Sequence, residues 1–168
     1  MQFSSIVFIF VFLPFIVTAY YLVPQKFKTP VMLVASLVFY AWGEPVYLVL
    51  LILSVAFNYF CGNDIEERRG EPWLARRSLF VGVAVNLLIL GFFKYYGWLL
   101  GTFNTLFSVS IPYRVLSLPI GLSFYTLQAL GYLVDVYHGE AKAQKNVFRF
   151  ALYMMMFPKL GAGPLVQY

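Results

Sequence analysis

Long runs without a charged side chain are the feature that most constrains the fold of this sequence. The hydrocarbon core of a bilayer is roughly 30 Å thick, so an α-helix needs about 20 residues to cross it. Four runs come close to that length and two are shorter: residues 1–25, 45–63, 95–113 and 115–134, then 29–43 and 78–93. The sequence therefore predicts several membrane-spanning helices.

Composition places the whole chain in the same class. Of its 168 residues, 61% are hydrophobic and 11% are charged, and the mean hydropathy is +0.78. Residues 46–57 are apolar on every face, whereas strands of a membrane barrel alternate apolar and polar residues. We expect an all-α fold, a polytopic transmembrane helical bundle forming a single membrane domain over residues 1–168. No Lys or Arg precedes Lys26, so the first run is predicted to be a retained helix and not a secretory signal.

The basic residues predict an orientation, because Lys and Arg concentrate in cytoplasmic loops. If the first run crosses from outside to inside, the amino terminus lies outside, and these residues lie inside: Lys26, Lys28, Arg68, Arg69, Arg76, Arg77, Lys142, Lys145 and Arg149. Lys94 and Arg114 then lie outside, provided that residues 95–113 and 115–134 together make one net crossing. The net charge of +5 gathers on no soluble face, so no nucleic-acid partner is expected. The mixed-charge stretch 64–72 is interpreted as a solvated connector.

Prolines in or beside the apolar runs predict broken helices. These are Pro14, Pro45, Pro112, Pro119, Pro158 and Pro164. In lipid, a break leaves backbone groups that neighbouring protein or water must satisfy, so broken helices often line cavities. We interpret Pro30, Pro45 and Pro72 as helix starts. Residues 118–121 and 157–164 are predicted to border a cavity.

No catalytic constellation is present in the chain. Its one histidine, His138, falls in a hydrophilic turn and is interpreted as a surface residue. Its one cysteine, Cys61, excludes an intrachain disulfide and a paired-cysteine metal site, and is interpreted as a packed small hydrophobe, with palmitoylation as the alternative. We expect no catalytic residue, no metal site and no cofactor-binding site within these residues.

Polar side chains inside the apolar runs are the remaining clues, because burying one in hydrocarbon is costly. Glu44 is expected at the membrane interface beside Trp42. Asn58 and Asn86 are expected to form hydrogen bonds between helices. Gln128 and Lys159 are the candidate cavity-lining residues, Lys159 because its ammonium lies in a stretch rich in Pro and Gly.

Several stretches, in the same order along the chain, resemble the membrane-bound O-acyltransferase family. They are residues 3–8 (FSSIVF), 36–43 (SLVFYAWG), 91–96 (GFFKYY), 118–128 (LPIGLSFYTLQ), 132–140 (YLVDVYHGE) and 157–165 (FPKLGAGPL). The resemblance is to the amino-terminal portion of the bacterial branch that contains the alginate O-acetyltransferase and the teichoic-acid D-alanyl transferase. It departs from the family at His138, where arginine is common, and at Gly161, where a larger aliphatic residue is common.

The resemblance implies transfer of an acyl group, with acetyl expected in this branch, from a cytoplasmic donor to hydroxyls of an extracytoplasmic polysaccharide, as in alginate biosynthesis. It implies a donor such as acetyl-CoA or another acyl carrier that is not tightly bound, and a multi-pass location in the bacterial cell membrane. The implied partners are membrane lipid, the polymer acceptor, extracytoplasmic partner proteins and a missing carboxy-terminal portion. In longer members the histidine regarded as catalytic lies in that later portion, so this chain alone is expected to be inactive.

Two other classes of membrane protein are alternatives to an acyltransferase. A non-catalytic membrane scaffold or a truncated remnant would share the same helices and motifs. A transporter would need an inverted repeat or coupling carboxylates within the helices, and the sequence has neither.

Overall fold

The computed structural model describes residues 6–107, 109, 112 and 118–156, and these residues contain helices and no strand. A π-helical turn, Phe8–Phe12, leads directly into the first α-helix. The α-helices are α1 (Leu13–Leu22), α2 (Gln25–Gly43), α3 (Pro45–Glu67), α4 (Pro72–Phe107), α5 (Leu122–His138) and α6 (Val147–Met155). The predicted all-α class is confirmed.

Proline explains where several helices begin. Pro45 and Pro72 are the first residues of α3 and α4, where a missing backbone N–H costs nothing. Pro14 stands near the start of α1, immediately after the π-helical turn. Pro14 has no N–H to donate to the preceding turn, and a local π-helical adjustment is one way in which a helix in lipid satisfies the backbone groups that a proline frees.

Pro30 does not begin a helix, so that part of the prediction is wrong. It lies inside α2, which begins five residues earlier at Gln25. The residue before the helix is Pro24, and the N–H of Phe27 donates to its carbonyl at 2.9 Å. A proline in the second turn of a helix loses one hydrogen bond, and here the helix was already established by the preceding turn.

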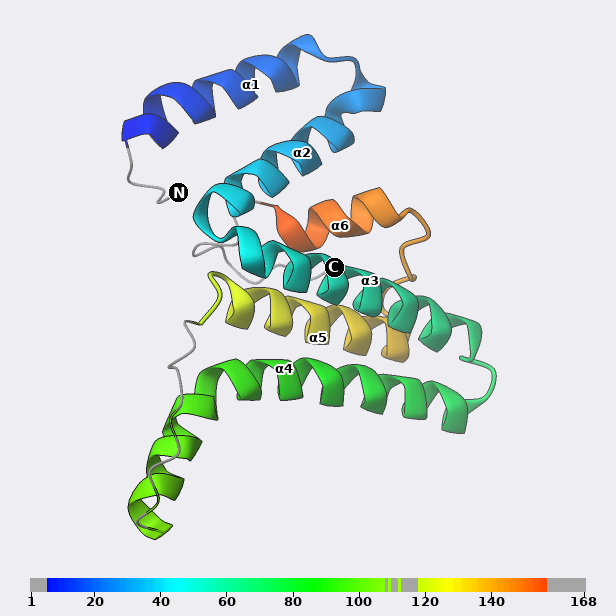
Figure 1. Ribbon diagram of the computed structural model, residues 1–168. Coiled ribbons are helices and arrows are strands. Elements are labelled where there is room, and N and C mark those ends of the chain that lie inside the picture. Colours follow the sequence, from blue (N-terminus) through cyan, green and yellow to red (C-terminus); the bar gives the residue numbers. More distant parts are fainter. Residues whose placement is uncertain (1–5, 108, 110–111, 113–117, 157–168) are drawn as a thin grey trace.

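Three helices form the centre of the bundle. Helices α3, α4 and α5 lie side by side, and each contacts the other two (Figure 1). Their shared core includes Leu51 of α3 and Leu122, Tyr132 and Leu133 of α5. Helix α6 packs against α2 and α3, while α1 contacts α2 at the margin of the bundle.

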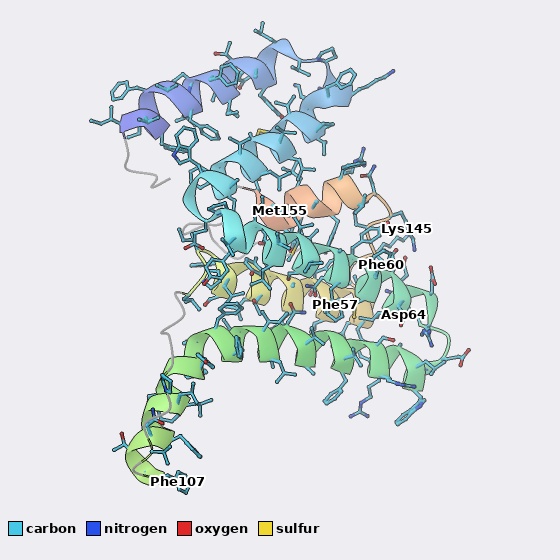
Figure 2. The ribbon with its side chains drawn as sticks, viewed as in Figure 1. Phe57, Phe60, Asp64, Phe107, Lys145 and Met155 are labelled. Atoms are coloured by element: carbon cyan, nitrogen blue, oxygen red, sulfur yellow. The ribbon has the colours of Figure 1, made fainter. Side chains whose placement is uncertain are left out.

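Helix α4 is longer than the sequence suggested. The sequence predicts two stretches, residues 78–93 and 95–113, divided by Lys94, but a single helix continues through Lys94 to Phe107. Its second part bends away from α3 and α5, and Phe107 lies far from the bundle (Figure 2). The ammonium of Lys94 lies 5.7 Å from the centre of the Tyr95 ring, a cation–π contact that accommodates the charge on the helix surface.

The surface and the interior have the polarity of a membrane protein. Large apolar side chains such as Phe10, Val46, Phe80 and Leu88 are exposed on the helices. Buried polar residues, in contrast, include Ser54, Asn58, Asn86 and Thr126. Helices α3 and α4 are long and apolar enough to cross a membrane by length and composition. The protein is an all-α membrane helical bundle.

Successive helices run in alternating directions, so the loops between them lie at two opposite ends of the bundle (Figure 1). The end at which α3 and α5 finish carries Asp64, Arg69, His138 and Lys145, and Figure 2 shows Asp64 and Lys145 together there. Helix α2 begins on that side, with Lys26 and Lys28 in its first turn. We call this the basic end. The opposite end contains the turn at Glu44 and the start of α5.

Candidate functional site

A buried pair of asparagines joins α3 to α4 at the middle of the bundle. The Nδ2 of Asn86 donates to Oδ1 of Asn58 at 2.8 Å, and the Nδ2 of Asn58 donates to Oδ1 of Asn86 at 3.2 Å. Each amide also donates to the carbonyl four residues earlier in its own helix, that of Ser54 or Gly82. The predicted role of these asparagines in hydrogen bonding between helices is confirmed.

Glu44 fixes the end of the bundle opposite the basic end. Its Oε2 accepts a hydrogen bond from the backbone N–H of Ile120 at 2.8 Å. Ile120 precedes Gly121, whose φ of 76° is the left-handed conformation that glycine adopts without strain, and α5 begins at the next residue. The carboxylate therefore ties the turn between α2 and α3 to the break before α5. The hydroxyls of Tyr40 and Tyr125 are buried nearby and have no hydrogen-bond partner among the described residues.

The two candidate cavity-lining residues have different outcomes. Gln128 is half-buried in α5, and its Nε2 donates to the carbonyl oxygen of Tyr153 in α6 at 2.7 Å. It therefore links two helices, and its exposure to a cavity stays a prediction. Lys159 and the predicted cavity segment 157–164 lie outside the described residues.

At the basic end, the connection between α5 and α6 is fastened to α3. Glu66 accepts from the N–H of Ala143 at 3.1 Å and from Nζ of Lys145 at 2.9 Å. Asn63 accepts from the same ammonium at 3.1 Å, and the Tyr59 hydroxyl donates to the carbonyl of Lys145 at 2.8 Å. The Glu66 carboxylate raises the pKa of Lys145. Sequence spacing gave no sign of these contacts, which join residues about 80 positions apart.

The turn between α3 and α4 is also hydrogen-bonded to the end of α5. The Nη2 of Arg69 donates to the carbonyl oxygen of Val136 at 2.5 Å, in the last turn of α5. Helix α5 ends at His138, and the next residue, Gly139, has a φ of 83° and lies beside the Arg69 guanidinium. A cation at a helix carboxyl end satisfies free carbonyls and complements the helix dipole. Arg69 thus acts as the cap of a helix that it is not part of.

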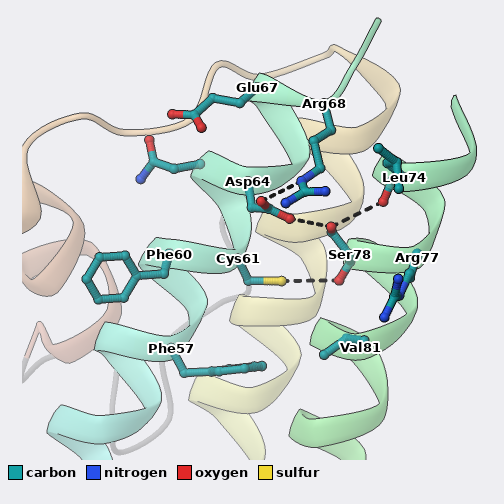
Figure 3. Close-up of a pocket in the computed structure, with 11 residues that line it drawn as sticks. Phe57, Phe60, Cys61, Asp64, Glu67, Arg68, Leu74, Arg77, Ser78 and Val81 are labelled. Carbon is teal, nitrogen blue, oxygen red and sulfur yellow. Dashed lines mark hydrogen bonds and ion pairs between the residues drawn. The ribbon is translucent and has the colours of Figure 1, made fainter. Parts of the chain in front are cut away.

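A cavity of about 650 Å³ lies between the end of α3 and the start of α4, at the basic end (Figure 3). Its polar wall contains Asn63, Glu67 and Arg77 and a linked group in which Asp64 accepts from Nε of Arg68 at 2.7 Å and from the hydroxyl of Ser78. Its apolar wall contains Phe57, Phe60, Leu74 and Val81. The expectation that the whole stretch 64–72 is a solvated connector is wrong for its first four residues, which complete α3. Asp64 and Glu67 line this cavity, and Glu66 holds the neighbouring loop.

Cys61 and His138 lie in ordinary structural surroundings. Cys61 is half-buried, and its Sγ donates to the carbonyl of Ser78 at 3.3 Å. His138 is exposed in the last turn of α5, with its ring against that of Tyr137. Within the described part of the chain, no three His, Cys, Asp or Glu residues are placed to hold a metal ion. Among the described residues, the arrangement orders helices and shapes a cavity, and the hydroxyl of Ser78 is bonded to an Asp64 carboxylate that Arg68 also engages.

Several known proteins are similar to this chain along its whole length. It is 40% identical over 173 residues to a protein named probable alginate O-acetylase of Azotobacter vinelandii, covering 100% of this chain and 34% of the relative. A protein of the same name from Pseudomonas aeruginosa is 39% identical, with 100% of this chain and 33% of the relative covered. The peptidoglycan O-acetyltransferase of Helicobacter pylori is 32% identical over 195 residues, with 99% and 37% covered. No family model and no solved structure matches the chain.

The fold and the surface define an integral membrane protein of packed helices. Within that class, the chain is similar along its whole length to the acetyltransferases named above, and this similarity supports the predicted resemblance to the amino-terminal portion of a membrane-bound O-acyltransferase. The chain spans about a third of the length of the curated relatives that it matches, since it covers 34% and 33% of the first two.

Proposed function

We propose that the protein containing this sequence transfers an acetyl group from a cytoplasmic donor to hydroxyls of an extracytoplasmic polysaccharide. The observation that carries the proposal is the similarity along the whole chain to two kinds of relative, which are named for O-acetylation of alginate and of peptidoglycan. Both names describe the same chemistry on carbohydrate hydroxyls. The donor we propose is acetyl-CoA or another acyl carrier, held only during turnover.

The proposed orientation places the basic end in the cytoplasm and the amino terminus outside, in the cell membrane of a bacterium. Its support is that the start of α2, which carries Lys26 and Lys28, lies at the same end of the bundle as the ends of α3 and α5, near Arg69 and Lys145. The positive-inside rule places such an end in the cytoplasm. The chain then makes several passes. The cavity between α3 and α4 opens at the cytoplasmic end, and the Glu44 turn faces the side where the polymer and its partner proteins are met.

The base that deprotonates the acceptor hydroxyl lies, in this proposal, outside residues 1–168. General base catalysis requires a group within hydrogen-bond reach of the proton it takes, with a suitable pKa. The single histidine of the chain is an exposed residue at a helix end, and the carboxylates of Asp64 and Glu66 are engaged by neighbouring side chains. We therefore propose that these helices build and orient part of the enzyme while the chemistry is completed by another portion.

The proposal is tested by removing the gene and measuring O-acetyl groups on the extracytoplasmic polysaccharides of the same cells. We expect one polymer to lose its acetyl groups and to regain them when the intact gene is returned. A return of the gene carrying His138→Ala is expected to restore acetylation as well. Unchanged acetylation after deletion would instead favour a non-catalytic membrane scaffold.

A further inference from the structure

A groove between α1, α2 and α6 combines an apolar slot with a cationic mouth. The slot, about 400 Å³, is lined by Leu13, Ile16, Val17 and Met32 among others. The mouth, about 500 Å³, is lined by Gln25, Lys28, Thr29 and Arg149 among others. The two spaces share five lining residues, so they form one continuous groove; the shared residues are Tyr20, Lys28, Thr29, Leu152 and Met156. Figure 1 shows α1 and α2 diverging in a V, with α6 beside α2.

Within the described part of the chain, no carboxylate neutralises the two cations of the mouth. All seven carboxylate side chains of the sequence lie among the described residues, and none of them lines either part of the groove. The ion pairs found in the described part of the chain join Arg68 to Asp64 and Lys145 to Glu66. The ammonium of Lys28 instead lies 4.8 Å from the centre of the Tyr20 ring. The groove therefore carries two positive charges beside an apolar slot.

The cavity between α3 and α4 provides an internal comparison. Its lining also contains two arginines, Arg68 and Arg77, but it contains Asp64 and Glu67 as well. Positive and negative charges balance there, and Arg68 is already paired. These charges predict a preference for an anion in the groove between α1, α2 and α6, and they predict no such preference in the cavity between α3 and α4.

We propose that this groove binds an anionic phospholipid of the surrounding membrane, with the phosphate between Lys28 and Arg149 and an acyl chain along the slot. A guanidinium holds two phosphate oxygens at once, and an ammonium adds a third donor. Basic pockets between membrane helices on the cytoplasmic side suit anionic head groups, and an apolar slot in contact with lipid suits an acyl chain. The lipid would seat α1, the marginal helix of the bundle, against α2 and α6. This inference uses the proposed orientation but does not depend on the proposed acetyl transfer.

The test uses the full-length protein in mild detergent, titrated with phosphatidylglycerol or phosphatidylcholine, with bound lipid counted by native mass spectrometry. We expect tight binding of one phosphatidylglycerol, and about a tenfold or greater loss of affinity in the double variant Lys28→Gln/Arg149→Gln. The matched control is Arg76→Gln/Lys142→Gln, which removes the same charge from exposed positions elsewhere and is expected to leave binding within about twofold.

Two further variants test the apolar slot and the charge of the mouth separately. Val17→Trp fills the slot without changing charge, and we expect it to weaken phosphatidylglycerol binding while the Lys28→Arg variant retains it. Equal loss in the matched control, equally tight phosphatidylcholine binding, or the absence of a retained lipid would each overturn the proposal. Displacement of phosphatidylglycerol by equimolar acetyl-CoA would also overturn it, because the groove would then serve the acyl donor.

Discussion

The guanidinium of Arg69 caps a helix that begins more than fifty positions later in the sequence, donating to the carbonyl oxygen of Val136 at 2.5 Å. The same side chain lies 3.5 Å from the carbonyl of Ala141, beyond the end of α5. It therefore connects the turn between α3 and α4 with the connection between α5 and α6. The two loops at the basic end are one unit.

Replacing Arg69 by methionine keeps an unbranched apolar stem and removes the charge and the donors of the guanidinium. We expect Arg69→Met to lower the free energy of unfolding by about 1.5–3 kcal/mol, because hydrogen bonds from charged groups contribute that much. Backbone amides after Gly139 should also exchange with solvent faster. The control is Arg76→Met at an exposed position of α4, which should change neither quantity. Equal effects of the two substitutions would contradict the cap.

The Asn58–Asn86 pair should show coupling in a double-mutant cycle. Each single change to leucine leaves the other amide buried without its partner across the helices, whereas the double change removes both polar groups. We expect a coupling energy of about 0.6–1.7 kcal/mol, the range found for hydrogen bonds between membrane helices. Unfolding in a denaturing detergent measures it. Additive effects of the two changes would show that the pair contributes nothing jointly.

Gly62 allows α3 and α5 to approach closely. A Cβ at this position would lie 2.5 Å from Cε1 of Tyr132, inside van der Waals contact. Gly62→Ala is therefore expected to destabilise the bundle by about 1–3 kcal/mol, the usual effect of overpacking. At Gly131 of α5, a Cβ meets nothing within 4 Å. Gly131→Ala should stabilise by up to about 1 kcal/mol through helix propensity, and a loss of stability there would undermine the comparison.

The Lys145–Glu66 contact gives a pH prediction. The carboxylate raises the pKa of Lys145, so the pair contributes fully below the unfolded lysine pKa of about 10.4 and is lost as the pH rises through the higher folded value. Between pH 6 and pH 9 the difference in loop opening between the protein and Lys145→Gln should stay constant, and it should shrink above the folded pKa. Hydrogen exchange of Ala143, corrected for the intrinsic rate, measures this difference. A difference that changes between pH 6 and pH 9 would assign the effect to another group.

Labelling of single cysteines tests the proposed orientation. In a Cys61→Ala background, Trp42→Cys marks the end of the bundle near Glu44, and Gly70→Cys marks the turn at the basic end. A maleimide that does not cross membranes should label Trp42→Cys in intact cells and Gly70→Cys only after permeabilisation. The reverse pattern would invert the orientation for every helix.

Local sequence patterns predicted the features that depend on one segment at a time. The apolar runs gave the membrane class, Pro45 and Pro72 gave two helix starts, and the isolation of Asn58 and Asn86 in apolar helices gave their hydrogen bonds. Each of these rests on the cost of placing a polar group or a proline in lipid.

The features that sequence reasoning missed depend on residues distant in the chain. Glu44 meets Ile120 across 76 positions, and Arg69 meets Val136 across 67. Which loop faces which is decided by the packing of α3, α4 and α5, and a single sequence contains no signal for that pairing. Pro30 and Lys94 misled in another way, since each reads locally as a break but is accommodated on a helix established by its neighbours.

The measurement that tests the central claim most directly is acetyl transfer across a membrane by the full-length protein in sealed vesicles. Donor labelled in its acetyl group is supplied only to the cytoplasmic face, and the polysaccharide is enclosed on the other side. The account predicts labelled ester on the enclosed polymer, and none when the same donor is supplied only to the opposite face. Absence of transfer in the first arrangement, or equal transfer in both, would contradict it.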